Sequence, residues 1–170
     1  MEIEKIYEEL GTKLADAERV LVGLGAEWKL KDEAREIQVM EAKAKLRDLL
    51  DEKDYFVIST LSKAELDRLG FIDFKTVAPA DECVTEEQWN GYMNWLSRTL
   101  NRKLVILELR EGFLQPTIIR WPFERTVMIN QKSCMYRVHK TFYQIADEIK
   151  DRATAVKADS VEFFAQWGEH

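Results

Sequence analysis

Two glycines near the start of the chain are the first residues whose type and spacing could do chemistry. Gly23 and Gly25 close a short apolar run that begins at Arg19, and Ala26 and Glu27 follow them. A glycine turn after a buried strand lets backbone N–H groups approach a phosphate, as in many nucleotide-binding parallel sheets. The pattern lacks a third glycine, so a purely structural turn is an equal alternative. Glu27 opposes phosphate binding, since a carboxylate about 4 Å from a phosphate charge costs roughly 4 kcal/mol at an effective dielectric constant of about 20.

Two further polar side chains could contact an anion or a ribose. Arg110 could offer two parallel N–H groups to a phosphate, but Glu108 and Glu111 are close enough in sequence to pair with it, and we favour the ion pair. His139 ends the last predicted strand and could stack on a base or hydrogen-bond a ribose. A satisfied surface histidine is the more common case, and no catalytic partner for His139 is visible in the sequence.

The cysteines and histidines do not form a metal-binding pattern. Cys83 and Cys134 are the two cysteines, and His139 and His170 are the two histidines. Two cysteines cannot build a disulfide framework, and this set is a poor match to a zinc site. We therefore expect reduced thiols in a cytoplasmic protein.

Composition limits the remaining classes of function. The 170 residues are 46% hydrophobic and 33% charged, which predicts one domain with an apolar core over residues 1–170. The formal charge of -6 repels phosphate backbones, so we expect no nucleic-acid partner. The charged N-terminal segment has no apolar signal-peptide stretch, and no apolar run reaches membrane-spanning length. We expect a soluble protein without a membrane partner.

The elements that must position these residues follow from hydrophobic spacing. Short apolar runs predict six strands, at residues 19–25, 54–60, 75–78, 103–109, 126–130 and 134–138. Apolar residues three or four positions apart predict helices at 3–18, 32–50 and 63–69, a helix opened by Thr85, a helical stretch at 142–149, and a short helix capped by Ser160. Strands alternate with helices throughout. The expected fold class is therefore α/β: a single doubly wound, Rossmann-like domain with a mainly parallel six-stranded sheet and helices on both faces.

With this order of strands, three stretches resemble the sirtuin (SIR2) family. Residues 103–124 resemble a block of divergent bacterial sirtuin-like proteins, of the form LELGVG-x-x-x-P-x-x-IRWPFE. Residues 20–28, VLVGLGAEW, resemble the first strand and glycine loop of the family. Residues 136–139 and 142–144 resemble its last strand and the helix that follows. Together these stretches span nearly the whole chain in order.

The resemblance implies a Rossmann-type domain that binds NAD between the sheet and a small zinc module, and that deacylates lysine or transfers ADP-ribose. The zinc module would fall near residues 81–88, where the chain carries only Cys83, so we expect no module and no zinc. The residues expected to contact NAD or ADP-ribose are Gly23, Gly25, Ala26, Glu27, Thr60, Glu108, Arg110 and His139.

The sequence departs from the family where the family's chemistry lies. A Thr-Asn-x-Asp element carries Leu61 and Lys63 in place of the amide and the carboxylate. The position of the catalytic histidine falls at Pro79 or Ala80, and neither side chain can accept a proton. Arg110 stands where the family has a glycine close to adenosine. These departures remove the groups that cleave NAD.

Resemblance and departures together predict a non-catalytic sirtuin-like domain, a pseudoenzyme that binds NAD or ADP-ribose weakly or acts as a protein-interaction module. The alternative is an active NAD-consuming enzyme, such as a deacylase, an ADP-ribosyltransferase or an NAD glycohydrolase, in which Glu27 or Glu108 stabilises a developing oxocarbenium ion. A third alternative is a shortened piece of a longer sirtuin-like protein.

Loss of a zinc module would also leave an apolar face open. The residues that would need cover are Trp89, Trp95, Phe113 and Trp121. Since exposed apolar patches of this kind are usually covered by a partner, we expect a homodimer through this face.

Overall fold

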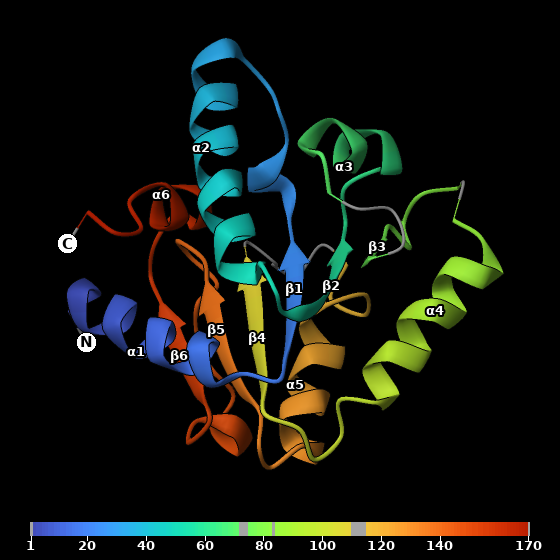
Figure 1. Ribbon diagram of the computed structural model, residues 1–170, viewed down its shortest axis with the longest axis vertical. Coiled ribbons are helices and arrows are strands. Elements are labelled where there is room, and N and C mark those ends of the chain that lie inside the picture. The colour runs from blue at the N-terminus through green and yellow to red at the C-terminus, as the bar shows by residue number, and fades with distance from the viewer. Residues whose placement is uncertain (1, 72–74, 83, 110–114, 170) are drawn as a thin grey trace.

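A six-stranded, entirely parallel sheet forms the centre of the protein, with the strand order β3-β2-β1-β4-β5-β6. The computed structural model describes residues 2–71, 75–82, 84–109 and 115–169. The strands are β1 (Arg19–Leu24), β2 (Asp54–Ser59), β3 (Thr76–Val77), β4 (Leu104–Leu109), β5 (Cys134–Val138) and β6 (Ala153–Val156) (Figure 1). This is the strand order of a Rossmann-type sheet, so the predicted fold class is confirmed.

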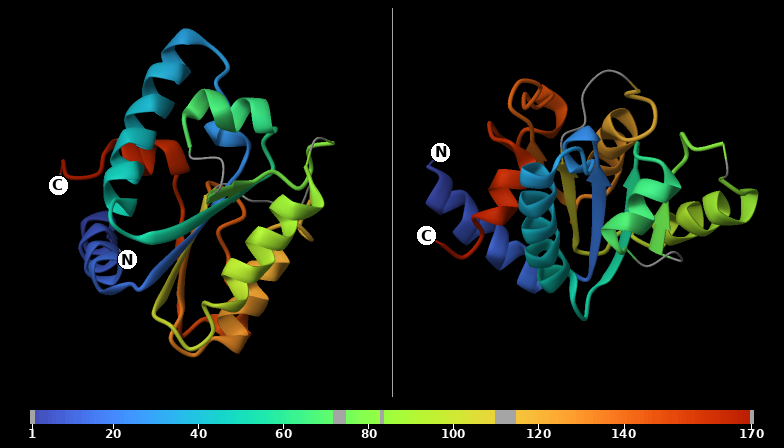
Figure 2. Two further views of the ribbon diagram at one scale, coloured as in Figure 1. Left: turned by 45° about the vertical axis from the view of Figure 1, so that its right-hand side comes forward. Right: turned by 90° about the horizontal axis from the view of Figure 1, so that it is seen from above.

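Helices cover both faces of the sheet (Figure 2). The first face packs against α1 (Ile3–Asp16), α2 (Glu33–Leu50), α3 (Lys63–Leu69) and α6 (Ser160–Ala165). The second face packs against α4 (Glu86–Ser97), α5 (Arg120–Ile129) and the short helix η3 (Asp147–Ile149). A further short helix, η1 (Ala26–Trp28), follows β1 directly.

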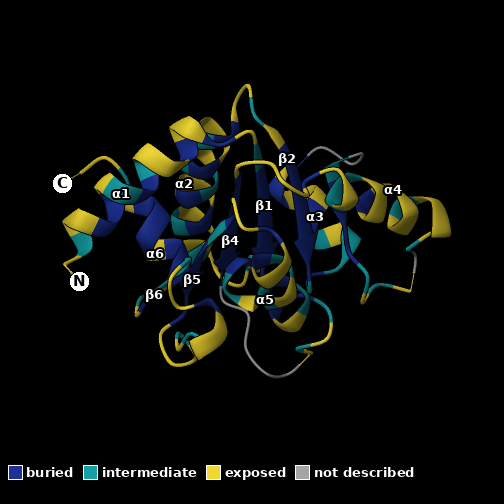
Figure 3. Ribbon diagram, turned by 90° about the horizontal axis from the view of Figure 1, so that it is seen from below, coloured by how far each residue is buried: buried dark blue, intermediate teal, exposed yellow. Residues whose placement is uncertain are grey.

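The central strands β1 and β4 are apolar except for Arg19 and Glu108, because both of their faces are buried (Figure 3). Alternate residues of β1 point to opposite layers: Val20, Val22 and Leu24 join the first core, and Leu21 joins the second. The continuous hydrophobic runs that predicted these strands therefore reflect two helical layers rather than one.

Side-chain caps set the helix starts that the sequence predicts. Asp32 accepts a hydrogen bond from the N–H of Arg35 at the start of α2. Ser62 and Thr85 both form capping boxes, at α3 and α4. The last helix differs from the prediction, because Asp159 caps α6 and Ser160 is its first residue.

Two predicted elements are wrong. Residues 126–130 were expected to form a strand, but they continue and end α5, in which Phe123 and Val127 are buried against the sheet. Pro122 lies in the first turn of α5, where no intrahelical N–H is needed. The stretch 142–149 was expected to be helical, but it is irregular apart from η3. The sixth strand is instead β6, which has only four residues and is too exposed to show the apolar pattern of a strand.

No helix in the described part of the chain combines the length and the hydropathy needed to cross a membrane.

Candidate functional site

The candidate site lies at the carboxyl ends of β1 and β4, where the strand order reverses and doubly wound sheets bind their ligands. The fold brings most of the predicted contact residues to this edge, after β1, β2 and β5 or within the end of β4. These residues are Gly25, Ala26, Glu27, Thr60, Glu108 and His139. Arg110, and with it the predicted pairing to Glu111, lies outside the described residues.

Gly23 is part of β1 rather than of the turn. A Cβ atom at Gly23 would lie 2.8 Å from side-chain atoms of both Ile119 and Phe123. The glycine therefore lets the start of α5 pack closely on the sheet.

Gly25 ends the strand in an extended conformation, with φ -99° and ψ -166°. Its N–H donates to the carbonyl oxygen of Leu109 at 2.9 Å, so it continues the ladder between β1 and β4. Ala26 is exposed at the start of η1. The turn after β1 is thus a short helix packed on the sheet, and the backbone of Gly25 is already engaged.

Glu27 is bound by the amino end of α6. Its Oε1 accepts hydrogen bonds from the N–H of Ser160 at 2.9 Å and from the Ser160 hydroxyl at 2.7 Å. The same hydroxyl accepts a hydrogen bond from Nε1 of the fully buried Trp28 at 3.0 Å. This contact ties the loop after β1 to the last helix and puts a carboxylate where a helix N-terminus would otherwise attract an anion.

A second carboxylate completes this cluster. Asp159 accepts hydrogen bonds from the N–H groups of Val161 and Glu162 and lies 3.2 Å from Nη2 of Arg35. Burial opposes ionisation, but the N–H of Glu162, the charge of Arg35, a hydrogen bond with the Glu27 side chain and the charge of Lys140 together hold the pKa of Asp159 below its ordinary value.

The amino end of α2 is also occupied by acidic side chains. Asp32 caps the helix, and Glu33 and Glu36 lie in its first turn. In nucleotide-binding sheets the helix that follows the first strand holds the pyrophosphate. Here three carboxylates and one cation, Arg35, lie at that end of the helix, so its net negative charge disfavours a phosphate.

Glu108 is completely buried beside Arg137, its register partner on β5. Nε and Nη2 of Arg137 both donate to Glu108, the latter at 3.1 Å. Nη2 also donates to Glu124 of α5 at 2.9 Å, and Nη1 donates to the carbonyl oxygen of Gln144 at 2.8 Å. Both carboxylate oxygens of Glu108 are therefore held by the protein itself.

Burial raises the pKa of Glu108, and the contacts with Arg137 oppose this effect. A raised carboxyl pKa in a crevice can mark a general acid. Here the carboxyl group is sealed between β4, β5 and α5, so the shift reflects the packing of the ion pair. Glu108 is not placed to touch a ligand.

His139 is buried rather than on the surface, which corrects the prediction. Its Nδ1 accepts hydrogen bonds from the N–H groups of Thr141 and Phe142, at 2.9 and 2.8 Å. Its ring also packs on Phe142, with the centroids 5.0 Å apart. The imidazole therefore organises the turn after β5.

Residues 60–63, where the resemblance predicted a Thr-Asn-x-Asp element, are held by contacts within the chain. The N–H of Thr60 donates to the carbonyl oxygen of Leu24 at 3.3 Å. Leu61 is buried in the first core. The N–H of Lys63 donates to Asp81 at 2.7 Å, and its ammonium pairs with Asp67 at 3.1 Å.

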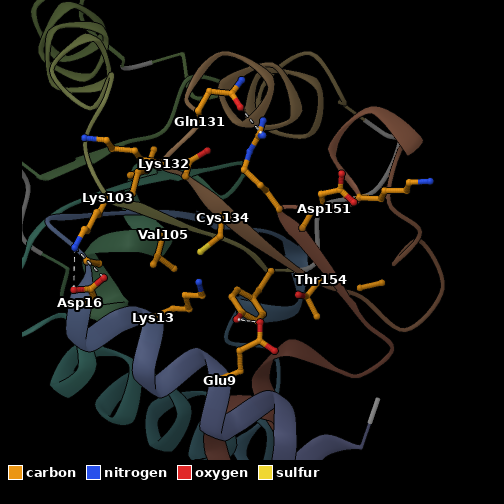
Figure 4. A pocket seen from close by; sticks show the side chains of 18 residues that line it. Glu9, Lys13, Asp16, Lys103, Val105, Gln131, Lys132, Cys134, Asp151 and Thr154 are labelled. Atoms are coloured by element: carbon orange, nitrogen blue, oxygen red, sulfur yellow. Dashed lines mark hydrogen bonds and ion pairs between the residues drawn. The ribbon is translucent and has the colours of Figure 1, made fainter.

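A hollow of about 780 Å³ lies at the opposite end of the sheet, between α1 and the amino ends of β4, β5 and β6. Figure 4 shows the thiol of Cys134 and the amine of Lys13 pointing into it. Burial raises the pKa of Cys134 to about 11, so the thiol stays protonated at neutral pH. Since only a thiolate is a good nucleophile, this hollow has no reactive cysteine.

Among the described residues, no three His, Cys, Asp or Glu side chains converge on a point where a metal ion could bind. Comparison of the chain with protein-family models and with curated proteins finds no match.

Sequence reasoning missed the partners that fill this end of the sheet, namely Arg137, Glu124, Asp159 and Ser160. One signal was available for the ion pair. Glu108 and Arg137 interrupt two predicted apolar strands with opposite charges, which in adjacent buried strands points to a salt bridge. No such signal exists for Ser160, whose contact with Glu27 spans 133 positions of the chain.

Proposed function

We propose that the chain is a sirtuin-like, Rossmann-type domain without catalytic activity that serves as a protein-interaction module. We base this on one observation: among the described residues, Glu108, Glu27 and His139 at the carboxyl ends of β4, β1 and β5 are already bound by Arg137, by Ser160 and by the backbone N–H of Phe142.

The charge at this edge supports the proposal. Glu27, Asp32 and Asp159 each sit at or near a helix N-terminus, where a phosphate would have to approach. A single carboxylate about 4 Å from a phosphate costs roughly 4 kcal/mol at an effective dielectric constant of about 20. The charges of the described residues at this edge therefore disfavour a dinucleotide.

The residue types at the expected reacting positions also argue against catalysis. Pro79 and Ala80 offer no proton acceptor in their side chains. Glu27 and Glu108, the two carboxylates that could stabilise a developing cation, are engaged by Ser160 and Arg137. An NAD-consuming enzyme that used Glu27 or Glu108 would need one of these carboxylates to face the reacting sugar.

The second layer of helices supports an interaction role. Trp89 and Met93 of α4 and Trp121 of α5 are exposed. Trp95 is half-buried, with its Nε1 donating to Asp54, and Phe113 lies outside the described residues. Exposed aromatic and methionine side chains on one face are typical of protein interfaces, so the expected homodimer remains the simplest form of the interaction.

The proposal is tested by incubating the purified full chain with NAD and measuring free nicotinamide against a control without protein. Calorimetric titrations with NAD and with ADP-ribose complete the test. We expect no nicotinamide above the control and no saturable heat with either ligand. Nicotinamide release would overturn the non-catalytic assignment, and saturable heat without release would establish a nucleotide-binding domain instead.

A further inference from the structure

Helix α4 is poorly covered by the rest of the chain. Tyr92 is its only buried residue among twelve. Trp89 and Met93 remain 39% and 43% exposed, although both are large and apolar. A helix at the outer edge of the molecule with these side chains in water leaves apolar area for another surface to cover (Figure 2).

Helix α5 forms the other wall of this open face. Between α4 and α5 lies a groove of about 460 Å³, whose apolar walls include Met93, Leu96, Ile118, Trp121 and Pro122. Trp121 is 51% exposed. A groove walled by tryptophan, methionine and leucine has the composition of an interface core.

The charges on α4 are distributed unequally along its axis. Glu86 and Glu87 lie in its first turn, and Arg98 is its C-terminal cap. Arg125 lines the groove from α5. Within the described chain these four side chains make no ion pair with one another or with other residues. The face therefore carries unpaired acid at one end and unpaired base at the other.

A second copy of the same face is complementary to this pattern in one orientation. If two α4 helices lie antiparallel, the acidic end of each faces the basic end of the other. The two helix dipoles then also point in opposite directions, which is favourable. A parallel arrangement would place acid against acid and base against base. The antiparallel arrangement is also the one that a two-fold axis across the helix produces.

We infer that two copies of this chain associate through the groove between α4 and α5, with the two α4 helices antiparallel. This inference rests on the proposed interaction role and identifies the partner as a second copy of the chain. The interface buries Trp89, Met93 and Trp121 at its centre and sets Glu86 and Glu87 against the partner's Arg98.

The mass in solution gives the first test. Sedimentation equilibrium over low to high micromolar concentrations should show a change from the 20.0 kDa monomer to a species of twice that mass. Met93→Lys and Trp121→Glu should each weaken dimerisation about tenfold or more, because each buries a charge at the centre of the interface. Ile37→Lys is the control, since Ile37 is 67% exposed on α2 in the opposite layer and should leave the dimer intact.

A charge exchange tests the orientation. Glu87→Arg and Arg98→Glu should each weaken the dimer several-fold, and the variant that carries both should regain most of the wild-type affinity. Thermal unfolding checks that every variant is folded. A monomer at all concentrations, or a dimer indifferent to Met93→Lys and Trp121→Glu, would overturn the interface. A dimer that Trp121→Glu breaks but the charge exchange leaves unchanged would overturn the antiparallel arrangement.

These outcomes are separable from the failure of the proposed function. A monomer that releases no nicotinamide refutes the dimer alone. A dimer that releases nicotinamide refutes the non-catalytic assignment and leaves the interface standing.

Discussion

Glu108 and Arg137 lie side by side at the same level of β4 and β5, and both are completely enclosed by the sheet and α5. Arg137 also contacts Glu124 and the carbonyl oxygen of Gln144. Since both carboxylate oxygens of Glu108 and the guanidinium of Arg137 are bound by described residues, the charge pair acts as part of the core. Its role is to join two strands, α5 and the segment after β5.

Arg137→Met should lower the free energy of unfolding by about 3–5 kcal/mol, because it leaves Glu108 buried without its partner. Urea denaturation monitored by tryptophan fluorescence measures the change. Glu124→Gln is the matched control. Glu124 contacts the same guanidinium but is partly exposed, so this variant should lower the free energy of unfolding by less than Arg137→Met.

Replacing both members of the pair tests whether the cost of Arg137→Met comes from the unpaired buried charge of Glu108. The double variant Glu108→Leu with Arg137→Met should be less destabilised than Arg137→Met alone, because no buried charge is left unpaired. A double variant as unstable as the sum of the two single changes would show that Glu108 and Arg137 act independently, and would contradict a buried charge pair.

Gly23→Ala should destabilise the protein by about 1–3 kcal/mol, because the added methyl group would meet Ile119 and Phe123 at the base of α5. Gly91→Ala is the matched control in the same second layer. A Cβ at Gly91 meets open space in the middle of α4, so this substitution should stabilise the protein by about 1 kcal/mol. Thermal unfolding of both variants is sufficient, and equal effects would contradict the account of Gly23.

Ser160→Ala should cost about 1–2 kcal/mol, because the hydroxyl that serves both Glu27 and Trp28 is lost. Ser97→Ala, which removes an exposed hydroxyl at the end of α4, should be nearly neutral. If the two variants have the same midpoint in urea, the contact between η1 and α6 does not hold the loop after β1.

Asp159 should make stability depend on pH in the acid range. Its folded-state pKa lies below the ordinary value of 3.8, so ionised Asp159 stabilises the fold above about pH 4, and this contribution is lost as the pH falls through the folded-state pKa. Asp159→Asn should therefore be less stable than the wild type by about 1–2 kcal/mol at neutral pH, with a smaller difference near pH 2–3. Unfolding in urea at several pH values measures the difference, and a difference that stays the same from neutral to acid pH would contradict this role of Asp159.

Hydrophobic period and capping residues were sufficient to predict most of the fold. Continuous apolar runs marked β1, β2 and β4 because both faces of these strands are buried, and Ser62 and Thr85 marked the starts of α3 and α4. The failures lie where local signals conflict. The β-branched residues near Thr126 suggested a strand, but the spacing of Phe123 and Val127 matches one face of a helix. Strand β6 is defined by its pairing with β5 and not by its own four residues.

The candidate site was less predictable than the fold, for a physical reason. Sequence placed Gly25, Glu27, Glu108 and His139 at one edge of a parallel sheet, since the carboxyl ends of parallel strands meet there. It could not show that Glu27 is bound by Ser160, because this contact depends on how α6 docks beside η1. Nor could it show that both hydrogen bonds to Nδ1 of His139 come from the turn directly after it.

Among the described residues, the chain's own side chains occupy the carboxyl-end edge of β1 and β4. Titration of the isotopically labelled full chain with ADP-ribose, followed by the amide NMR signals of Gly25, Ala26 and Glu27, tests it most directly. We predict that these three signals do not move with increasing ADP-ribose. Saturable shifts of these amides would contradict the account, because they would place the ligand where the carboxylate of Glu27 now lies.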